Sequence, residues 1–164
     1  MIERGDKIPA MPIKLIDQNG ISDDTTSAVL GTGKVVLFSV PGAFTPTCHT
    51  NHLPGFVANA DKMRAAGVSR IVCIAANDHH VMKAWAEGSD ALGKVDFLAD
   101  GNADFAKALG LEKDFSAAGM GVRFARAAML ISDGIVEAVF VEDAPGVNAS
   151  GAPAILLALE ASRK

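Results

Sequence analysis

A cysteine at the start of a predicted helix is the residue best placed to do chemistry in this sequence. The apolar segment 35–40 runs into a Pro-Gly turn at Pro41, and seven residues later the chain reaches Cys48. Thr45 is a favourable N-cap and Pro46 suits the first helical position, so Cys48 is expected at the third. Backbone N–H groups are unpaired there and the helix dipole is positive, which favours a thiolate. The spacing predicts a nucleophile, whereas the structural alternative is a buried small hydrophobe.

Two neighbours of this cysteine have both a structural and a chemical interpretation. Thr45 can cap the helix and also hydrogen-bond an oxygen atom of a bound substrate. Pro41 can shield the sulfur from bulk water, although a proline at such a turn is commonly structural. The two interpretations are compatible at both positions.

The second cysteine, Cys73, lies in the middle of the apolar segment 70–76. Burial in a strand raises the pKa of a thiol and makes it inert, so we expect a core residue there. The alternative is a resolving cysteine that forms a disulfide with Cys48.

Histidines near Cys48 form a partial metal-ligand pattern with it. On a helix, Cys48 and His52 share a face while His49 points elsewhere, and a fourth ligand is not evident. A Cys–His hydrolytic pair is a second alternative. The simpler interpretation places His52 beside the thiol as a structural neighbour.

Arg123 and Arg126 precede a predicted β-hairpin. They are either surface charges or permanent cations that hold a thiolate and a departing oxygen anion, and spacing alone does not choose between these roles. The segment 119–121 does not complete a dinucleotide or phosphate-binding fingerprint, so a nucleotide site is not indicated.

Alternating strands and helices position these residues. The expected fold is an α/β sandwich with a mixed sheet, forming a single domain over 1–164. Strands are expected at 11–16, 35–40, 71–76 and 95–99, with a hairpin over 126–141 that turns at 133–134. Helices are expected at 45–64 with a kink at 54–55, after 77–78, around 105–109 and from Pro153 onwards.

Composition narrows the functional classes. The chain has 164 residues, of which 49% are hydrophobic and 21% charged, as in a globular protein. The net charge of −4 and the absence of a basic run argue against a nucleic-acid partner. Neither a secretory signal nor a membrane-spanning stretch is evident, so no membrane partner is expected. Two cysteines without a CxxC spacing favour reduced thiols and a cytoplasmic location.

Pro41, Thr45 and Cys48 together form the pattern Pro-x-x-x-Thr-x-x-Cys, which resembles the peroxiredoxin signature. The flanks at 40–46 and 52–56 are similar to the type II (peroxiredoxin-5-like) group in particular. Further matches follow in order through most of the chain, at 77–78, 81–85, 98–100, 126 and 133–134.

This resemblance implies a thioredoxin-like fold and a thiol peroxidase that uses no metal, haem or flavin. Cys48 would be the peroxidatic cysteine and Thr45 would orient the peroxide. Pro41 would shield the site, and Arg126 would be the active-site arginine.

Other positions fall outside the catalytic set that the resemblance implies. Arg123 is outside the signature and is left as a second charge near the site. His52 matches the group's 52–56 stretch without belonging to that set. Some relatives carry a second cysteine after the hairpin, but the segment 141–153 contains none.

We therefore expect a one-cysteine cycle in which hydrogen peroxide or an organic hydroperoxide oxidises Cys48 to a sulfenic acid. Glutathione with glutaredoxin, or thioredoxin, would then reduce it. The resemblance also implies a homodimer. The alternatives are a redox-sensing protein whose Cys48 oxidation controls a partner, a peroxidase resolved by Cys73, and a thiol–disulfide oxidoreductase, which normally needs two cysteines close in sequence.

Overall fold

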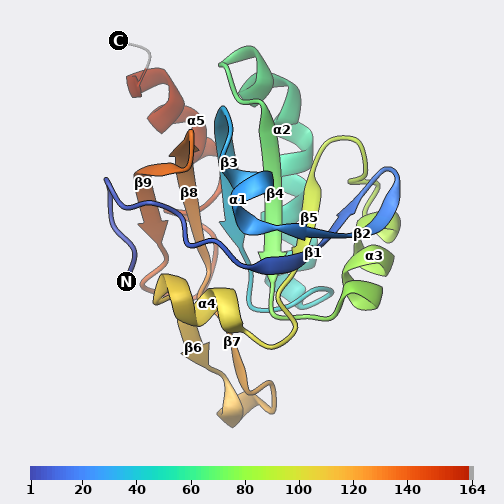
Figure 1. Cartoon of the computed structure of the whole chain (residues 1–164). Coiled ribbons are helices and arrows are strands. Elements are labelled where there is room, and N and C mark those ends of the chain that lie inside the picture. The colour runs from blue at the N-terminus through green and yellow to red at the C-terminus, as the bar shows by residue number, and fades with distance from the viewer. Residues whose placement is uncertain (163–164) are drawn as a thin grey trace.

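A seven-stranded mixed sheet forms the centre of the protein, in a computed structural model that describes residues 1–162 (Figure 1). The central strands β3, β4 and β5 are parallel, and β1 and β8 flank them in antiparallel pairing. In spatial order the strands are β2 (Gly20–Thr25), β1 (Pro12–Asp17), β5 (Asp96–Ala99), β4 (Arg70–Ala75), β3 (Lys34–Ser39), β8 (Ala127–Ser132) and β9 (Ile135–Val141).

Helices cover both faces of this sheet. One face packs against α2 (Leu53–Ala65), α3 (His79–Gly88) and α5 (Ala152–Ser162), and the other against α1 (Thr26–Leu30) and α4 (Asp104–Leu109). Alternation along β3 separates the two cores, because successive side chains of a strand point to opposite faces. Val36 and Phe38 pack on the α2 side. Val35 and Leu37 pack on the α4 side.

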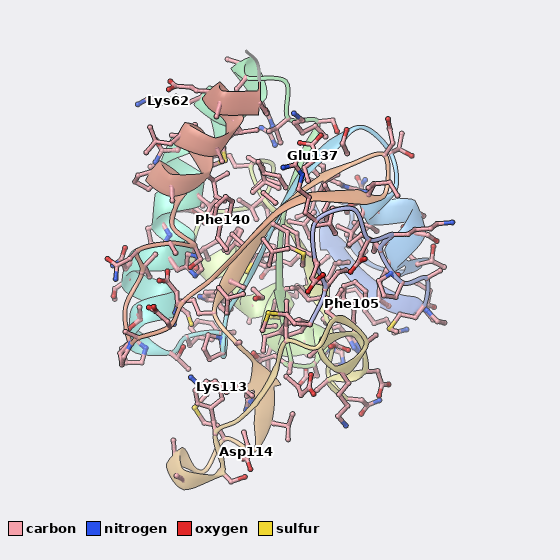
Figure 2. The ribbon with its side chains drawn as sticks, turned by 90° about the vertical axis from the view of Figure 1, so that its left-hand side faces the viewer. Lys62, Phe105, Lys113, Asp114, Glu137 and Phe140 are labelled. Atoms are coloured by element: carbon pink, nitrogen blue, oxygen red, sulfur yellow. The ribbon has the colours of Figure 1, made fainter. Side chains whose placement is uncertain are left out.

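A small two-stranded sheet projects from the body of the molecule (Figures 1 and 2). It pairs β6 (Glu112–Asp114) with β7 (Val122–Phe124), and a short 3₁₀ turn, η2 (Ser116–Ala118), joins them. Figure 2 shows Lys113 and Asp114 on this projection. Phe124 at its base is fully buried, which fixes the projection to the α4 side of the core.

The predicted α/β sandwich with a mixed sheet is confirmed. Four of the expected strands lie within one residue of their predicted bounds, as β1, β3, β4 and β5. The hairpin of β8 and β9 turns at Asp133 and Gly134, whose φ angles of 47° and 81° suit the tight turn expected there. Among residues 1–162, no helix is long and apolar enough to cross a membrane.

Elements that the sequence did not predict are β2, α1 and the projecting pair β6–β7. Strand β2 carries the polar run from Ser22 to Asp24, so hydrophobic periodicity does not mark it. Its backbone pairs with β1 over six residue pairs, and Lys14 forms an ion pair with Asp23 across the two strands. Pairing with a neighbour, which local sequence does not reveal, makes this segment a strand.

The α2-side core provides a test of the fold. Phe97 is fully buried and meets Trp85 edge-on with ring centroids 5.9 Å apart. Replacing Phe97 with alanine should lower the free energy of unfolding by about 3–5 kcal/mol, because a cavity remains. The control Leu157→Ala removes a side chain that is 69% exposed and should change stability by less than about 0.5 kcal/mol. Urea denaturation measures both, and equal losses would contradict the assignment of Phe97 to the core.

Candidate active site

Strand pairing brings together two segments that lie far apart in the sequence. Strand β3 ends at Ser39, and the chain then enters the turn that leads to Cys48. Strand β8 begins at Ala127, which lies directly opposite Ser39 in the antiparallel register. Arg126, one residue before that strand, is therefore delivered to the same end of the sheet as the cysteine.

The turn after β3 is held by hydrogen bonds within itself and to a neighbouring loop. The Ala43 N–H donates to Asn77 Oδ1 at 2.9 Å, and the Thr45 hydroxyl donates to the Gly42 carbonyl at 2.6 Å. Phe44 has a φ of 62°, a left-handed backbone that is uncommon for an aromatic residue. Such outliers persist only where surrounding structure fixes them, and they are common beside functional sites.

The helix begins where the sequence predicted. Pro46 is the first helical residue, and the first helical hydrogen bond runs from the His49 N–H to the Thr45 carbonyl at 2.9 Å. Cys48 is therefore at the third position, as expected. Because the Thr45 hydroxyl donates its proton to the turn, its oxygen can accept a hydrogen bond from a substrate.

The first turns of this helix are wider than α-helical turns. Residues Cys48–His52 form a π-helical turn, η1, closed by the Leu53 N–H donating to the Cys48 carbonyl. The sequence predicted a kink at residues 54–55, but those residues lie within α2, and the irregular turn precedes them at Cys48–His52. It ends just before Pro54, which has no N–H for a regular helical bond. Wide turns of this kind are frequent at functional sites.

Arg126 contacts the cysteine sulfur directly. Its Nη2 donates to Cys48 Sγ at 3.1 Å, and its Nη1 lies 3.0 Å from His52 Nδ1. The Cys48 side chain is fully buried, so the guanidinium faces the sulfur in a poorly solvated environment where charge interactions are strong. A guanidinium carries five N–H donors, which leaves others for the oxygen atoms of a substrate.

His52 supports Arg126 as a neutral imidazole. Its Nε2 lies 2.9 Å from the Ser150 carbonyl, which can only accept, so Nε2 carries the proton and Nδ1 accepts from Arg126. Burial lowers the pKa of His52 to about 4, and the nearby Arg126 charge contributes in the same direction. Because both ring nitrogens are committed, the alternative of a Cys–His hydrolytic pair is wrong: the arginine, and not the imidazole, bonds the sulfur.

The remaining member of the suspected metal cluster points elsewhere. His49 Nδ1 accepts a hydrogen bond from Trp85 Nε1 at 3.1 Å, which ties the start of the cysteine helix to α3. Within residues 1–162, no group of three or more histidine, cysteine or acidic side chains is arranged to hold a metal ion.

Cys73 lies in β4 and is fully buried in the same core as Cys48. Burial raises the pKa of its thiol well above the usual value, and a charge on Cys48 would raise it further. Both cysteines are free thiols in this structure. The position agrees with the expectation of an inert core thiol.

Arg123 supports the turn and not the sulfur. Its Nε donates to the Met120 carbonyl at 2.9 Å, and its Nη1 lies 3.5 Å from the Pro41 carbonyl. A Cβ at Gly42 would lie 3.2 Å from this Nη1 and 3.1 Å from Thr45 Cγ2, so a larger residue there would require these side chains to shift slightly.

A surface pocket of about 440 Å³ opens beside the guanidinium, and Pro41, Thr47 and Arg126 contribute to its lining. A larger hollow, of about 690 Å³, lies near Asp78 and Asp100 and contains none of the predicted site residues. The smaller pocket is therefore the one that reaches two of the predicted site residues, Pro41 and Arg126, although Cys48 and Thr45 do not line it.

Ser150 and Glu142 are contacts of the site that sequence reasoning missed. Ser150 holds His52, and the Glu142 carboxylate holds Ser150. Local sequence did not indicate Glu142, because counting from the turn at 133–134 places Val141 opposite Arg126. A register shift between Leu130 and Ile131 moves Glu142 to that position. No local pattern marks Ser150 as a partner of a histidine 98 residues earlier.

Known proteins are similar to this chain over nearly its whole length. The family model described as Redoxin matches residues 3–156. Peroxiredoxin-2E-2, chloroplastic, of Oryza sativa subsp. japonica is 44% identical over 161 residues, covering 94% of this chain and 71% of the relative. Peroxiredoxin-2B of Arabidopsis thaliana is 41% identical over 156 residues, covering 94% and 96%.

Solved structures agree with these relatives. Reduced Prx3 from Vibrio vulnificus in complex with hydrogen peroxide is 42% identical and has a TM-score of 0.92, covering 99% of each chain. Peroxiredoxin 5 from Alvinella pompejana is 34% identical with a TM-score of 0.86, covering 98% of this chain and 99% of that one. With a buried cysteine on a helical turn and an arginine on its sulfur, the chain belongs to the type II (peroxiredoxin-5-like) group of the peroxiredoxin family and is a thiol peroxidase.

Proposed function

We propose that Cys48 is the peroxidatic nucleophile of this enzyme and that Arg126 is the cation that activates it. The observation that carries the proposal is the 3.1 Å contact between Arg126 Nη2 and Cys48 Sγ at the third position of a helix. A permanent cation and unpaired helical N–H groups both favour the thiolate.

In the first step the Cys48 thiolate attacks one oxygen of a peroxide, ROOH. A sulfur–oxygen bond forms as the oxygen–oxygen bond breaks, so sulfur loses two electrons and the peroxide gains them. The products are a sulfenic acid and RO⁻, which takes a proton to become ROH or water. Arg126 stabilises the negative charge that develops on the departing oxygen.

Thr45 and Pro41 orient and protect the reacting atoms. Because the Thr45 hydroxyl donates to Gly42, its oxygen accepts a hydrogen bond from the peroxide O–H. Pro41 lines the pocket beside Arg126 and limits the access of water to the sulfur. Orientation of this kind lowers the barrier without new covalent chemistry.

A second thiol must reduce the sulfenic acid, and we assign that thiol to another molecule. Cys73 is fully buried with a raised pKa, which makes it a poor nucleophile. Glutathione with glutaredoxin, or thioredoxin, therefore completes the cycle, and the oxidising substrates are hydrogen peroxide and organic hydroperoxides.

The family resemblance supports a homodimer. Two free thiols suit a reducing compartment, which supports a cytoplasmic location.

Steady-state turnover tests the proposed activity. Cys48→Ser should abolish peroxide consumption with a glutaredoxin–glutathione or a thioredoxin system, because no nucleophile remains. Cys73→Ser should retain turnover and serves as the matched control. One oxidation equivalent per chain with every reductant, followed by no further consumption, would instead identify a redox sensor.

The source of the second thiol is tested by mass spectrometry of the reduced protein after one equivalent of hydrogen peroxide, without other thiols. A sulfenic acid on Cys48, trapped with dimedone, is expected, because Cys73 is too buried to attack. A Cys48–Cys73 disulfide would overturn the one-cysteine cycle while leaving the peroxidase assignment intact.

Arg126→Ala tests the role of the guanidinium. Its reaction with hydrogen peroxide should slow by about a hundredfold or more, because the sulfur and the departing oxygen lose their cationic donor. Ionisation of Cys48, followed by thiolate absorbance, should require a higher pH than in the unmodified protein. Arg64→Ala is a control, because Arg64 contacts only carbonyl groups near Gly93 and should leave both measurements unchanged. Wild-type behaviour of Arg126→Ala would remove the arginine from the mechanism.

A further inference from the structure

A closed circuit of hydrogen bonds surrounds the guanidinium of Arg126. Its first link is between backbones: the Glu142 N–H donates to the Arg126 carbonyl at 3.0 Å, just beyond the last residue pair of β8 and β9. The other links run through side chains from Arg126 to His52, from His52 to Ser150 and from Ser150 back to Glu142. Four separate parts of the chain are joined at this point.

The Glu142 carboxylate organises the loop that leads into α5. It accepts hydrogen bonds from three consecutive backbone N–H groups, those of Asn148 at 2.7 Å, Ala149 at 3.0 Å and Ser150 at 2.9 Å. The Ser150 hydroxyl adds a fourth at 2.6 Å. Partial burial opposes ionisation of Glu142, but these hydrogen bonds outweigh it and lower the pKa of the carboxyl. A carboxylate with this many donors fixes the course of the loop.

The organised loop presents one acceptor to the active site. Ser150 is fully buried and its carbonyl accepts from His52 Nε2 at 2.9 Å. This bond selects the tautomer in which Nδ1 has a lone pair, and that lone pair accepts from Arg126. His52 is also wedged between aromatic rings, 5.1 Å from Phe38 and 5.5 Å from Phe56. The imidazole therefore has one orientation.

We propose that Glu142 is a positioning residue for the peroxidase reaction, holding Arg126 on Cys48 through the Ser150 carbonyl and the His52 imidazole. The inference rests on the proposed roles of Cys48 and Arg126 and extends them. An arginine side chain has about 2 kcal/mol of rotamer entropy to lose when it is held in one geometry. The circuit fixes that geometry before peroxide binds, so less side-chain entropy is lost when the reactive arrangement forms.

The indirect path has an electrostatic advantage over a direct ion pair. Among residues 1–162, the ion pairs do not include one between Glu142 and Arg126. A carboxylate placed on the guanidinium would offset the positive charge that faces the sulfur. The neutral Ser150 carbonyl and His52 imidazole lie between Glu142 and Arg126. They fix the orientation of the guanidinium without offsetting the positive charge that faces the Cys48 sulfur.

Glu142→Gln is the sharpest variant, because it keeps the size of the side chain but converts one accepting oxygen into an N–H₂ donor. Backbone N–H groups of the loop then lose an acceptor, and the Ser150 carbonyl is no longer fixed. The rate constant of the reduced protein with hydrogen peroxide, measured by stopped flow without a reductant, should fall by about tenfold. Ionisation of Cys48 should shift to higher pH in the same variant.

Glu137→Gln is the matched control. Glu137 belongs to the same strand, β9, as Figure 2 shows, and it forms a partly exposed ion pair with Lys34 at 3.5 Å. The rate and the ionisation of Cys48 should both match those of the unmodified protein.

A double-mutant cycle separates positioning from general loosening of the fold. If Glu142 acts through Arg126, adding Glu142→Gln to Arg126→Ala should change the rate by less than about twofold, because the positioned group is already gone. A further tenfold loss in the double variant would show an effect independent of Arg126 and would overturn the proposal.

His52→Phe tests the middle link and remains informative if Glu142→Gln fails to fold. Phenylalanine suits the aromatic surroundings but has no nitrogen for Arg126, so a loss close to that of Glu142→Gln is expected, again absent in the Arg126→Ala background. Unchanged rates in His52→Phe would overturn the circuit. A slow Arg126→Ala with a normal Glu142→Gln refutes only the positioning role of Glu142, whereas a normal Arg126→Ala refutes the proposed role of Arg126 on which it rests.

Discussion

The antiparallel register between β3 and β8 is the constraint on which the site depends. Val36 pairs with Leu130 and Phe38 with Ala128, and all four side chains enter the α2-side core. Because side chains alternate along a strand, Arg126 lies on that same face, which is where Cys48 is buried. If the register of β8 slipped by one residue, Arg126 would lie on the α4 side of the sheet. The apolar side chains of β8 would then each face the opposite core. The hydrophobic pattern that stabilises the sheet therefore also fixes the position of Arg126.

Partial burial of the Arg126 charge is tolerated because its groups that face the protein interior are paired. A guanidinium partly withdrawn from water needs acceptors for its N–H groups, and the Cys48 sulfur and the His52 imidazole accept from two of them. The imidazole in turn stays neutral, since burial and the adjacent cation both lower its pKa. The Glu142 carboxylate is separated from the guanidinium by two neutral groups, and the loop N–H donors hold it there. The site thus sets the Arg126 cation against the Cys48 sulfur among neutral polar contacts.

Sequence analysis could predict only the part of the site that one short, continuous segment forms by itself. The order Thr45, Pro46, Cys48 predicted the helix start and the position of the cysteine correctly. The Thr45 hydroxyl, however, bonds the Gly42 carbonyl in the turn and is not the expected cap. The role of Arg126 could not be predicted from spacing, which does not distinguish Arg126 from Arg123. Only the family resemblance distinguished them. Partners such as Ser150 depend on contacts across 98 residues, which no helical or strand period encodes. The same reason hides β2, whose polar residues become a strand through pairing with β1.

The contact between Trp85 and His49 has a consequence for how this protein can be observed. Trp85 is the only tryptophan in the chain, and its indole N–H bonds the residue next to Cys48 while its ring packs on Phe97. Indole fluorescence depends on the hydrogen bonding and the solvent around that N–H group. The emission of the whole protein therefore comes from one site that touches the cysteine helix. Any rearrangement of η1 that separates the two rings will be visible as an optical signal, without a label.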